Sequence, residues 1–198
     1  MSSNKKQELY FSVDIEADGP IPIEYSMLSF GCAVFNTAGE LLGTFEANLD
    51  TLSGAKQDPD TMDWWSTQSE AWEKCRENTI DPALAMKSFT EWVTKVCEEH
   101  NGLPVFLAYP AGFDFTFMYV YLVKFTGHSI FSFSSLDIKS YAMGLLKTPF
   151  RETTKRNFPK RWKSKRRHTH VAVDDAIGQG ELFINIFKEA NESITTTQ

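Results

Sequence analysis

Two acidic side chains lie two residues apart in an otherwise apolar, aromatic-rich stretch near the N-terminus, residues 10–16. If this stretch is a strand, Asp14 and Glu16 point to one face while Val13 and Ile15 point to the other. Two acids on one face of a buried strand repel each other and are unfavourable to desolvate. Their oxygen ligands favour Mg²⁺ or Mn²⁺, although a strand whose acids simply face water shows the same pattern.

A third acid follows a second apolar segment. Residues 104–109 are nearly all apolar, which is typical of a central strand, and residues 110–114 open an aromatic helix. Asp114 therefore stands where a strand ends and a helix begins. An acid there commonly caps the helix, but ligands also gather at such strand ends in open α/β sheets. Gly112 lets the backbone approach a ligand closely.

The third acidic cluster contains His170, Asp174 and Asp175. Either aspartate suits a helix N-terminus, and a lone histidine is most often structural. However, His170 lies five residues before Asp175, at the mouth of a predicted helix. A carboxylate with a titratable base one turn upstream is what metal-assisted hydrolysis requires. The small residues Ala176 and Gly180 share one helix face, which predicts close packing on the sheet with Asp175 near the first strand.

The elements that position these residues follow from hydrophobic periodicity and turn signals. Strands are expected at residues 9–16, 27–35, 41–49 and 104–109, with a short fifth strand near 130–134. Helices are expected within 61–75, and at 81–99, from the turn 110–114 to about 125, from 135 or 137 to 146, and at 173–191, with a frayed end from Ile194. Three meander strands followed by alternating helices and strands predict a mixed α/β sheet. We expect one domain over residues 1–198, with a core of about 9–190.

Composition restricts the class of protein. The 198 residues suit one α/β domain, and no apolar run reaches the ~18 residues of a membrane span. The first six residues lack the features of a signal peptide. Cys32, Cys75 and Cys97 lie far apart and form no CxxC pair. A reduced compartment, the cytoplasm, is therefore expected, with no membrane partner.

Charge is distributed unevenly. The chain has 20 Lys and Arg against 26 Asp and Glu, for a net charge of −6. Residues 151–167, here called the basic segment, hold nine of the Lys and Arg and one acid, Glu152. The remaining chain has 11 basic and 25 acidic residues, a formal −14. A basic block in an acidic protein is either a solvated loop or a nucleic-acid contact.

Together these motifs resemble a known family. Asp14-x-Glu16, Phe113-Asp114-x-x-Phe117 and His170-x-Ala172-x-x-Asp175-Ala176 are similar, in order and spacing, to the three exonuclease motifs of the DEDD superfamily. The histidine five residues before the last aspartate marks the DEDDh branch. The chain most resembles a compact bacterial and phage group with a Trp-Trp pair, here Trp64-Trp65. One departure is Pro110, where many relatives have Asn.

The resemblance implies a ribonuclease H-like fold: a five-stranded mixed sheet, antiparallel at its second strand, with helices on both faces. It also implies a 3′–5′ exonuclease that releases nucleoside 5′-monophosphates from single-stranded DNA or RNA. Two Mg²⁺ or Mn²⁺ ions would be held by Asp14, Glu16, Asp114 and Asp175. His170 would act as general base. Several members of this family are homodimers, so a homodimer is a plausible assembly.

Substrate contacts also follow from the resemblance. Ala17, Asp18 and Gly19 would line the terminal nucleotide, and Met27, Leu28, Phe113 or Phe117 would wedge against its base. From the basic segment we expect Lys163, Lys165, Arg166 and Arg167 to guide the phosphate backbone. Trp64, Trp65 and Trp162 are expected to pack into the body of the protein.

Two other functions fit the sequence less well. The first is an inert module that binds nucleic acid or a polymerase, although nothing in such a module requires four acids and a histidine. The second is a zinc protein that uses His168 and His170 with cysteines, although no cysteine lies nearby in the chain. The choice between RNA and DNA rests on contacts to a 2′-hydroxyl, which the sequence does not place.

Overall fold

The computed structural model describes residues 6–166 and 169–195, without the side chains of residues 193–195. Its strands form one sheet in the order β3-β2-β1-β4-β5. They are β1 (Gln7–Ala17), β2 (Met27–Phe35), β3 (Leu41–Asn48), β4 (Gly102–Ala108) and β5 (Leu136–Asp137). β2 is antiparallel to β1 and β3, whereas β4 is parallel to β1 and β5. The predicted mixed sheet, antiparallel at its second strand, is confirmed.

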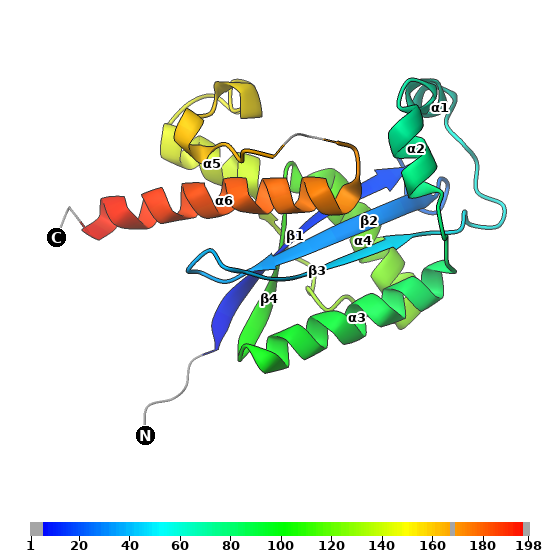
Figure 1. Cartoon of the computed structure of the whole chain (residues 1–198), viewed down its shortest axis with the longest axis horizontal. Coiled ribbons are helices and arrows are strands. Elements are labelled where there is room, and N and C mark those ends of the chain that lie inside the picture. The colour runs from blue at the N-terminus through cyan, green and yellow to red at the C-terminus, as the bar shows by residue number, and fades with distance from the viewer. Residues whose placement is uncertain (1–5, 167–168, 196–198) are drawn as a thin grey trace.

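Helices cover both faces of this sheet. They are α1 (Pro59–Ser66), α2 (Ser69–Cys75), α3 (Pro82–Glu99), α4 (Ala111–Thr126), α5 (Ile138–Leu146) and α6 (Ala172–Thr195). In Figure 1, α6 and α5 lie on one face, α3 lies across the other face, and α1 and α2 stand beyond the tip of β1. Within the described ranges, no helix is both long and apolar enough to cross a membrane.

The alternation of β1 separates the core from the chemistry, as the sequence predicts. Val13 and Ile15 are buried with apolar residues of α3 and α4. Tyr10 points to the opposite face and packs on α6 with Phe183, ring centroids 4.8 Å apart. Because side chains two residues apart share a face, this second face also carries the carboxylates further along β1. The central strand therefore carries its acids toward its C-terminal end, on the face opposite the α3–α4 core.

The fifth strand was predicted in the wrong place. It is the two-residue strand Leu136–Asp137, which pairs with Leu107 and Ala108 of β4. Residues 130–134 form turns instead, since Ser132 has a positive φ of 59° and Phe131 is buried against the α3–α4 core. Phe131 thus fills the core without pairing in the sheet, whereas Phe133 is exposed.

Two helix ends also differ from the prediction. α1 begins at Pro59 because Asp58 accepts a hydrogen bond from the backbone N–H of Thr61 at 2.9 Å, a capping arrangement that the sequence analysis overlooked. α6 continues through Thr195, so the frayed end predicted from Ile194 was wrong for those residues. By contrast, α3 begins at Pro82 after the cap Asp81, as expected.

Candidate active site

The N-terminus of α6 lies directly on the sheet, next to the acids of β1. Gly31 of β2 pairs with Asp14, and a Cβ at Gly31 would lie 2.2 Å from the backbone nitrogen of Val173. Any side chain there would therefore push α6 away. Gly180 makes a second close approach, since a Cβ there would meet the ring of Phe35 at 2.3 Å. These contacts bring the first turn of α6 to the β1 carboxylates, as the small-residue face predicted.

Asp114 is fixed to the end of β1. Its Oδ1 accepts a hydrogen bond from the backbone N–H of Ile15 at 3.0 Å. This N–H lies beyond the last paired residues, Ser12 and Leu107, of the β1–β4 ladder, so the carboxylate replaces a strand partner. The bond ties the first turn of α4 to the strand that carries Asp14 and Glu16.

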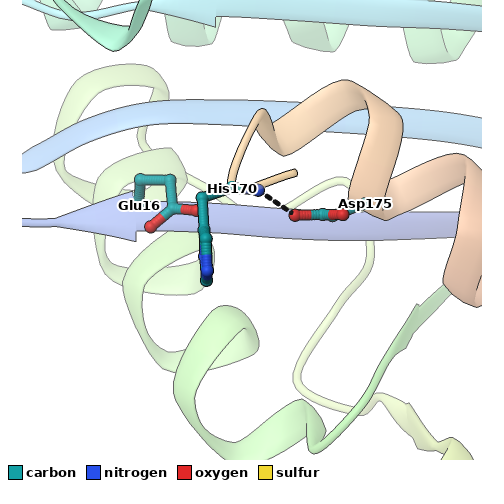
Figure 2. Close-up of side chains that lie close together, drawn as sticks. All are labelled: Glu16, His170 and Asp175. Atoms are coloured by element: carbon teal, nitrogen blue, oxygen red, sulfur yellow. Dashed lines mark hydrogen bonds between the residues drawn. The ribbon is translucent and has the colours of Figure 1, made fainter. Parts of the chain in front are cut away.

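Asp175 is fixed by the loop that carries the histidine. Its two carboxylate oxygens accept hydrogen bonds from the backbone N–H groups of Thr169 (3.1 Å) and His170 (2.8 Å). His170 has a positive φ of 57°, which turns its backbone N–H toward Asp175 and leaves its ring over β1 (Figure 2). Ligand atoms of Glu16, His170 and Asp175 lie within 4.8 Å of one another. Residues distant in sequence therefore meet as predicted.

Burial makes this cluster of acids electrostatically unfavourable in the absence of a cation. It raises the pKa of Asp14 well above its ordinary value, with further increases from Asp114, Glu16 and Asp175. It raises the pKa of Glu16 to about 8 and that of Asp114 to about 7. Lys155 acts in the opposite direction and lowers the pKa of Asp14 and Asp114. Without a bound cation, part of the cluster therefore retains protons near neutral pH.

Gln179, four residues after Asp175 on α6, is a residue that the sequence analysis gave no role. It is buried, its Nε2 donates to the backbone oxygen of Val13 at 2.6 Å, and its Oε1 accepts from the N–H of Tyr109 at 3.1 Å. One amide thus joins α6, β1 and the turn that leads to Asp114. A lone amide on an apolar helix face, one turn after a site aspartate, was the only signal in the sequence.

The tryptophan pair has two different environments. Trp65 is 2% exposed and its Nε1 donates to the backbone oxygen of Ala17 at 3.0 Å, so it anchors the end of β1 as predicted. Trp64 is 39% exposed, and its ring lies edge-on to His170 with centroids 5.1 Å apart. The prediction that Trp64 packs in the core was wrong, because α1 presents successive residues to different sides.

The residues predicted to hold the terminal nucleotide continue beyond Glu16. Ala17, Asp18 and Gly19 are buried, and Asp18 Oδ1 accepts from the backbone N–H of Ser26 at 2.5 Å. A Cβ at Gly19 would lie 2.2 Å from the ring of Tyr25, so only glycine fits there. This turn of residues 17–19, here called the shelf, lies at the end of β1 and is held by contacts with Tyr25 and Ser26.

The four apolar candidates for the base contact divide by exposure. Met27, Leu28 and Phe117 have no exposed surface, whereas Phe113 is 42% exposed. Phe113 packs on Phe117 with ring centroids 5.0 Å apart. Of the four, Phe113 alone exposes a surface that a base can contact, and the other three are buried beneath the protein surface.

The basic segment returns to the body of the protein through two 3₁₀ turns, η1 (Lys155–Asn157) and η2 (Lys160–Trp162). Trp162 is buried, as predicted, and its Nε1 donates to Glu189 of α6 at 2.6 Å. Of the predicted phosphate contacts, Lys163 and Arg166 line a cavity together with Asp175. Lys165 is exposed and does not line this cavity. Arg167, like His168, lies outside the described residues.

The donor set fits a hard divalent cation. Carboxylate oxygens and one imidazole converge, and the group of potential metal ligands in the described chain contains no cysteine. Cys32 and Cys75 are buried free thiols. This arrangement favours Mg²⁺ or Mn²⁺ over the cysteine–histidine zinc site considered as an alternative.

Comparison of the sequence with known protein families identifies the family of this chain. The model of a family described as "3'-5' exoribonuclease Rv2179c-like domain" matches residues 10–187. The chain belongs to this family. It is a 3′–5′ exonuclease of the DEDDh type with a ribonuclease H-like fold, as the motifs predicted. The alternative of an inert binding module is therefore not supported.

Known relatives agree with this assignment. The chain is 34% identical over 180 residues to an Escherichia coli protein named 3'-5' DNA exonuclease Cap18, covering 89% of this chain and 90% of that one. The nuclease domain of 3'hExo, a DEDDh family member bound to rAMP, has a TM-score of 0.68 at 12% identity, covering 94% and 95% of the two chains. S. pombe Pop2p, in an Mg²⁺- and Mn²⁺-bound form, has a TM-score of 0.63 at 16% identity, covering 89% and 82%.

Proposed function

We propose that this enzyme hydrolyses single-stranded nucleic acid from its 3′ end and releases nucleoside 5′-monophosphates, with two divalent cations held by Asp14, Glu16, Asp114 and Asp175. The observation that carries the proposal is the convergence of Glu16, His170 and Asp175 within 4.8 Å, beside Asp14 and the buried acid Asp114. The raised pKa values of these acids indicate a site built to be neutralised by cations.

Each chain residue has a distinct task in this proposal. Divalent ions, when bound, supply stabilisation of charge on the attacking and leaving oxygens. His170 accepts a proton from the attacking water at its ring, which stands over β1 beside Glu16 (Figure 2). The hydrogen bonds from Thr169 and His170 to Asp175 hold the loop and the ligand in one arrangement. The cluster is therefore organised before substrate arrives.

The terminal nucleotide rests on the shelf formed by Ala17, Asp18 and Gly19. Phe113 contacts its base, and Phe117 supports Phe113 from behind. Met27 and Leu28, which are fully buried, act as the packing beneath the shelf. An aromatic contact of this kind tolerates any base, so we expect degradation with little sequence preference. The cytoplasmic location and the homodimer stay predictions.

Substrate choice is tested with matched oligonucleotides. The family is described as exoribonucleases, whereas the Cap18 relative is named a DNA exonuclease, so RNA and DNA of one sequence are compared directly. Each is labelled at its 5′ end and digested with Mg²⁺ or Mn²⁺, as a single strand and as a blunt duplex. We expect a ladder of progressively shortened products and faster decay of the single strands.

Two results would contradict the proposal. The first is a single internal cut in place of a ladder, which indicates an endonuclease. The second is equal decay of an oligonucleotide whose 3′ end is blocked, because the proposed shelf accepts only a free terminal nucleotide. The ratio of RNA to DNA rates then assigns the preferred sugar.

A further inference from the structure

A small cavity connects the basic segment with the carboxylate cluster. Its volume is about 170 Å³. It lies between α6 and the segment that precedes it, and it is lined by Lys155, Lys163, Ser164, Arg166, Asp174, Asp175, Gly178, Gln179 and Leu182. Asp175 therefore faces both the cluster and this cavity. Because ligand pockets for whole small molecules are roughly 300–1,000 Å³, a nucleoside does not fit, but a single phosphate group does.

Lys155 is the cation of this cavity whose charge acts on the catalytic acids. Its effect on the pKa of both Asp14 and Asp114 places its charge within electrostatic reach of them. Its Nζ lies 4.9 Å from the ring centroid of Tyr109, and among the described residues it forms no ion pair. Tyr109 is itself held by Gln179 and by Thr153, whose backbone oxygen accepts from the Tyr109 hydroxyl at 3.1 Å. The ammonium therefore rests on a fixed aromatic ring.

Charge distinguishes this cavity from two larger hollows beside His170. One, between α2 and the His170 loop, contains Glu70 and no Lys or Arg. The other, over β3, contains Lys74 together with Glu46 and Glu77. The small cavity has three cations against two acids, and one of these acids is a proposed metal ligand. Of the three hollows, it offers the best site for an anion.

The position of the cavity selects one phosphate of the substrate. Gln179 in its wall bonds to Val13, whereas the shelf for the terminal nucleotide begins at Ala17, four residues or about 13 Å further along β1. The cavity and the shelf thus lie on opposite sides of Asp14. A strand whose 3′ nucleotide is on the shelf, with its terminal linkage at the carboxylates, continues toward the cavity.

Building on the proposed exonuclease function, we propose that Lys155 and this cavity bind the phosphate immediately 5′ of the linkage being cut. Lys155 donates to that phosphate from its place on Tyr109, and Lys163 and Arg166 complete the anion site. The site takes a nucleic-acid backbone phosphate of either sugar type. It holds the upstream strand in line while the terminal linkage reacts.

The test combines a charge-removing variant with a substrate that lacks one charge. Three single-stranded oligonucleotides are compared: one with all phosphates, one with a neutral methylphosphonate at the second linkage from the 3′ end, and one with it at the fifth. Release of the first nucleotide is measured in single turnover, as a rate constant and a half-saturation concentration, for wild type and Lys155→Met. Lys160→Met is the matched control, because Lys160 lies in the same segment but outside the cavity.

For wild type, we expect neutralising the second linkage to lower the ratio of rate constant to half-saturation concentration about tenfold, the effect of losing one hydrogen bond to a charged group. Lys155→Met should lose about tenfold on the unmodified strand and little more on the modified one. Lys160→Met should respond to the second linkage as wild type does, and neutralising the fifth linkage should have the same small effect in all three proteins.

Undiminished sensitivity of Lys155→Met to the second linkage would overturn the assignment of this phosphate, as would equal sensitivity at the fifth linkage. Both outcomes leave the exonuclease proposal intact, since wild type still releases mononucleotides. If wild type releases no nucleotide from the unmodified strand, the proposed function itself fails, and the phosphate site fails with it.

Discussion

The carboxylate cluster and the basic segment are held in different ways. Two acids of the cluster are tied to the backbone of another element, Asp114 to β1 and Asp175 to the loop before α6, while Asp14 and Glu16 stand on the paired strand β1 itself. The basic segment is anchored by the buried Phe158 and Trp162, but two of its cations are held by ion pairs at the surface. Arg161 pairs with Glu189 at 2.6 Å and Arg166 with Glu181 at 2.9 Å, both with much exposed area.

This difference matches two tasks: the cluster carries out the reaction, and the basic segment binds the substrate. Backbone hydrogen bonds inside a packed fold keep the ligands of a reaction in one geometry, which catalysis requires. Exposed ion pairs contribute only about 0–1 kcal/mol each and weaken with salt. The segment that follows a flexible nucleic-acid strand can therefore adjust, whereas the cluster cannot. Changes in the cluster should affect the rate constant, and changes in the segment should affect affinity.

The largest effect is expected for Asp175→Asn. The amide oxygen can still accept one of the two loop hydrogen bonds, so the fold persists while a proposed metal ligand is lost. A loss of several kcal/mol of charge stabilisation corresponds to about a thousandfold or more in kcat. Asp60→Asn, an exposed acid in the first turn of α1, is the matched control and should act as wild type. Similar activity of the two variants would contradict the role of Asp175.

A smaller effect is expected for Gln179→Met, which keeps the volume and removes both hydrogen bonds. Without this amide, Val13 and Tyr109 lose their common partner, and Asp14 shifts relative to Asp114. We expect kcat to fall about tenfold with KM nearly unchanged. Asn185→Leu removes another amide of α6, bonded to the backbone of Trp162, and serves as the control. An equal fall in kcat for both variants would contradict a positioning role for Gln179 and indicate that it only stabilises the fold.

The basic segment should respond in affinity and not in kcat. Lys163→Ala and Arg166→Ala each remove one predicted phosphate interaction beside the cavity. Binding to single strands should weaken several-fold, and the slope of log affinity against log salt should flatten by about 0.7 for each cation that no longer neutralises a phosphate. Fluorescence anisotropy over a salt series measures this slope. A slope identical to that of wild type would show that these residues do not contact the phosphates.

The smallest effect is in stability. The pKa of Glu16 is raised from 4.5 to about 8, so the metal-free folded protein binds more protons than the unfolded chain between these values. Its stability should therefore decrease as the pH rises from about 5 to 8, by on the order of 1 kcal/mol or more, or a few °C in Tm. Saturating Mg²⁺ should cancel the decrease, and Glu16→Gln should reduce it. A metal-free Tm that rises over this range would contradict the assigned pKa.

The sequence predicts the elements and the acids because both depend on local pattern. Alternation placed Asp14 and Glu16 on one face, and helix spacing brought Asp175 to the sheet. What depends on contacts between distant residues was not predictable: Gln179 bridges Val13 and Tyr109, and Trp64 of α1 contacts His170 in the loop before α6. The misplaced fifth strand has the same origin, since only the position of β4 decides which two residues pair with it.

The central claim is that the acids of β1 hold divalent ions for hydrolysis at a 3′ terminus. Its most direct test is the release of nucleoside 5′-monophosphate from a single strand by wild type and by Asp14→Asn, over a titration of Mn²⁺, with Tm measured for both proteins. We expect wild-type release that saturates with Mn²⁺ and stops on chelation. Asp14→Asn should lose about a thousandfold or more in rate while its metal-free Tm is equal or higher, because the repulsion among the acids is relieved. Release that persists without divalent ions, or a folded Asp14→Asn with the wild-type rate, would contradict the claim.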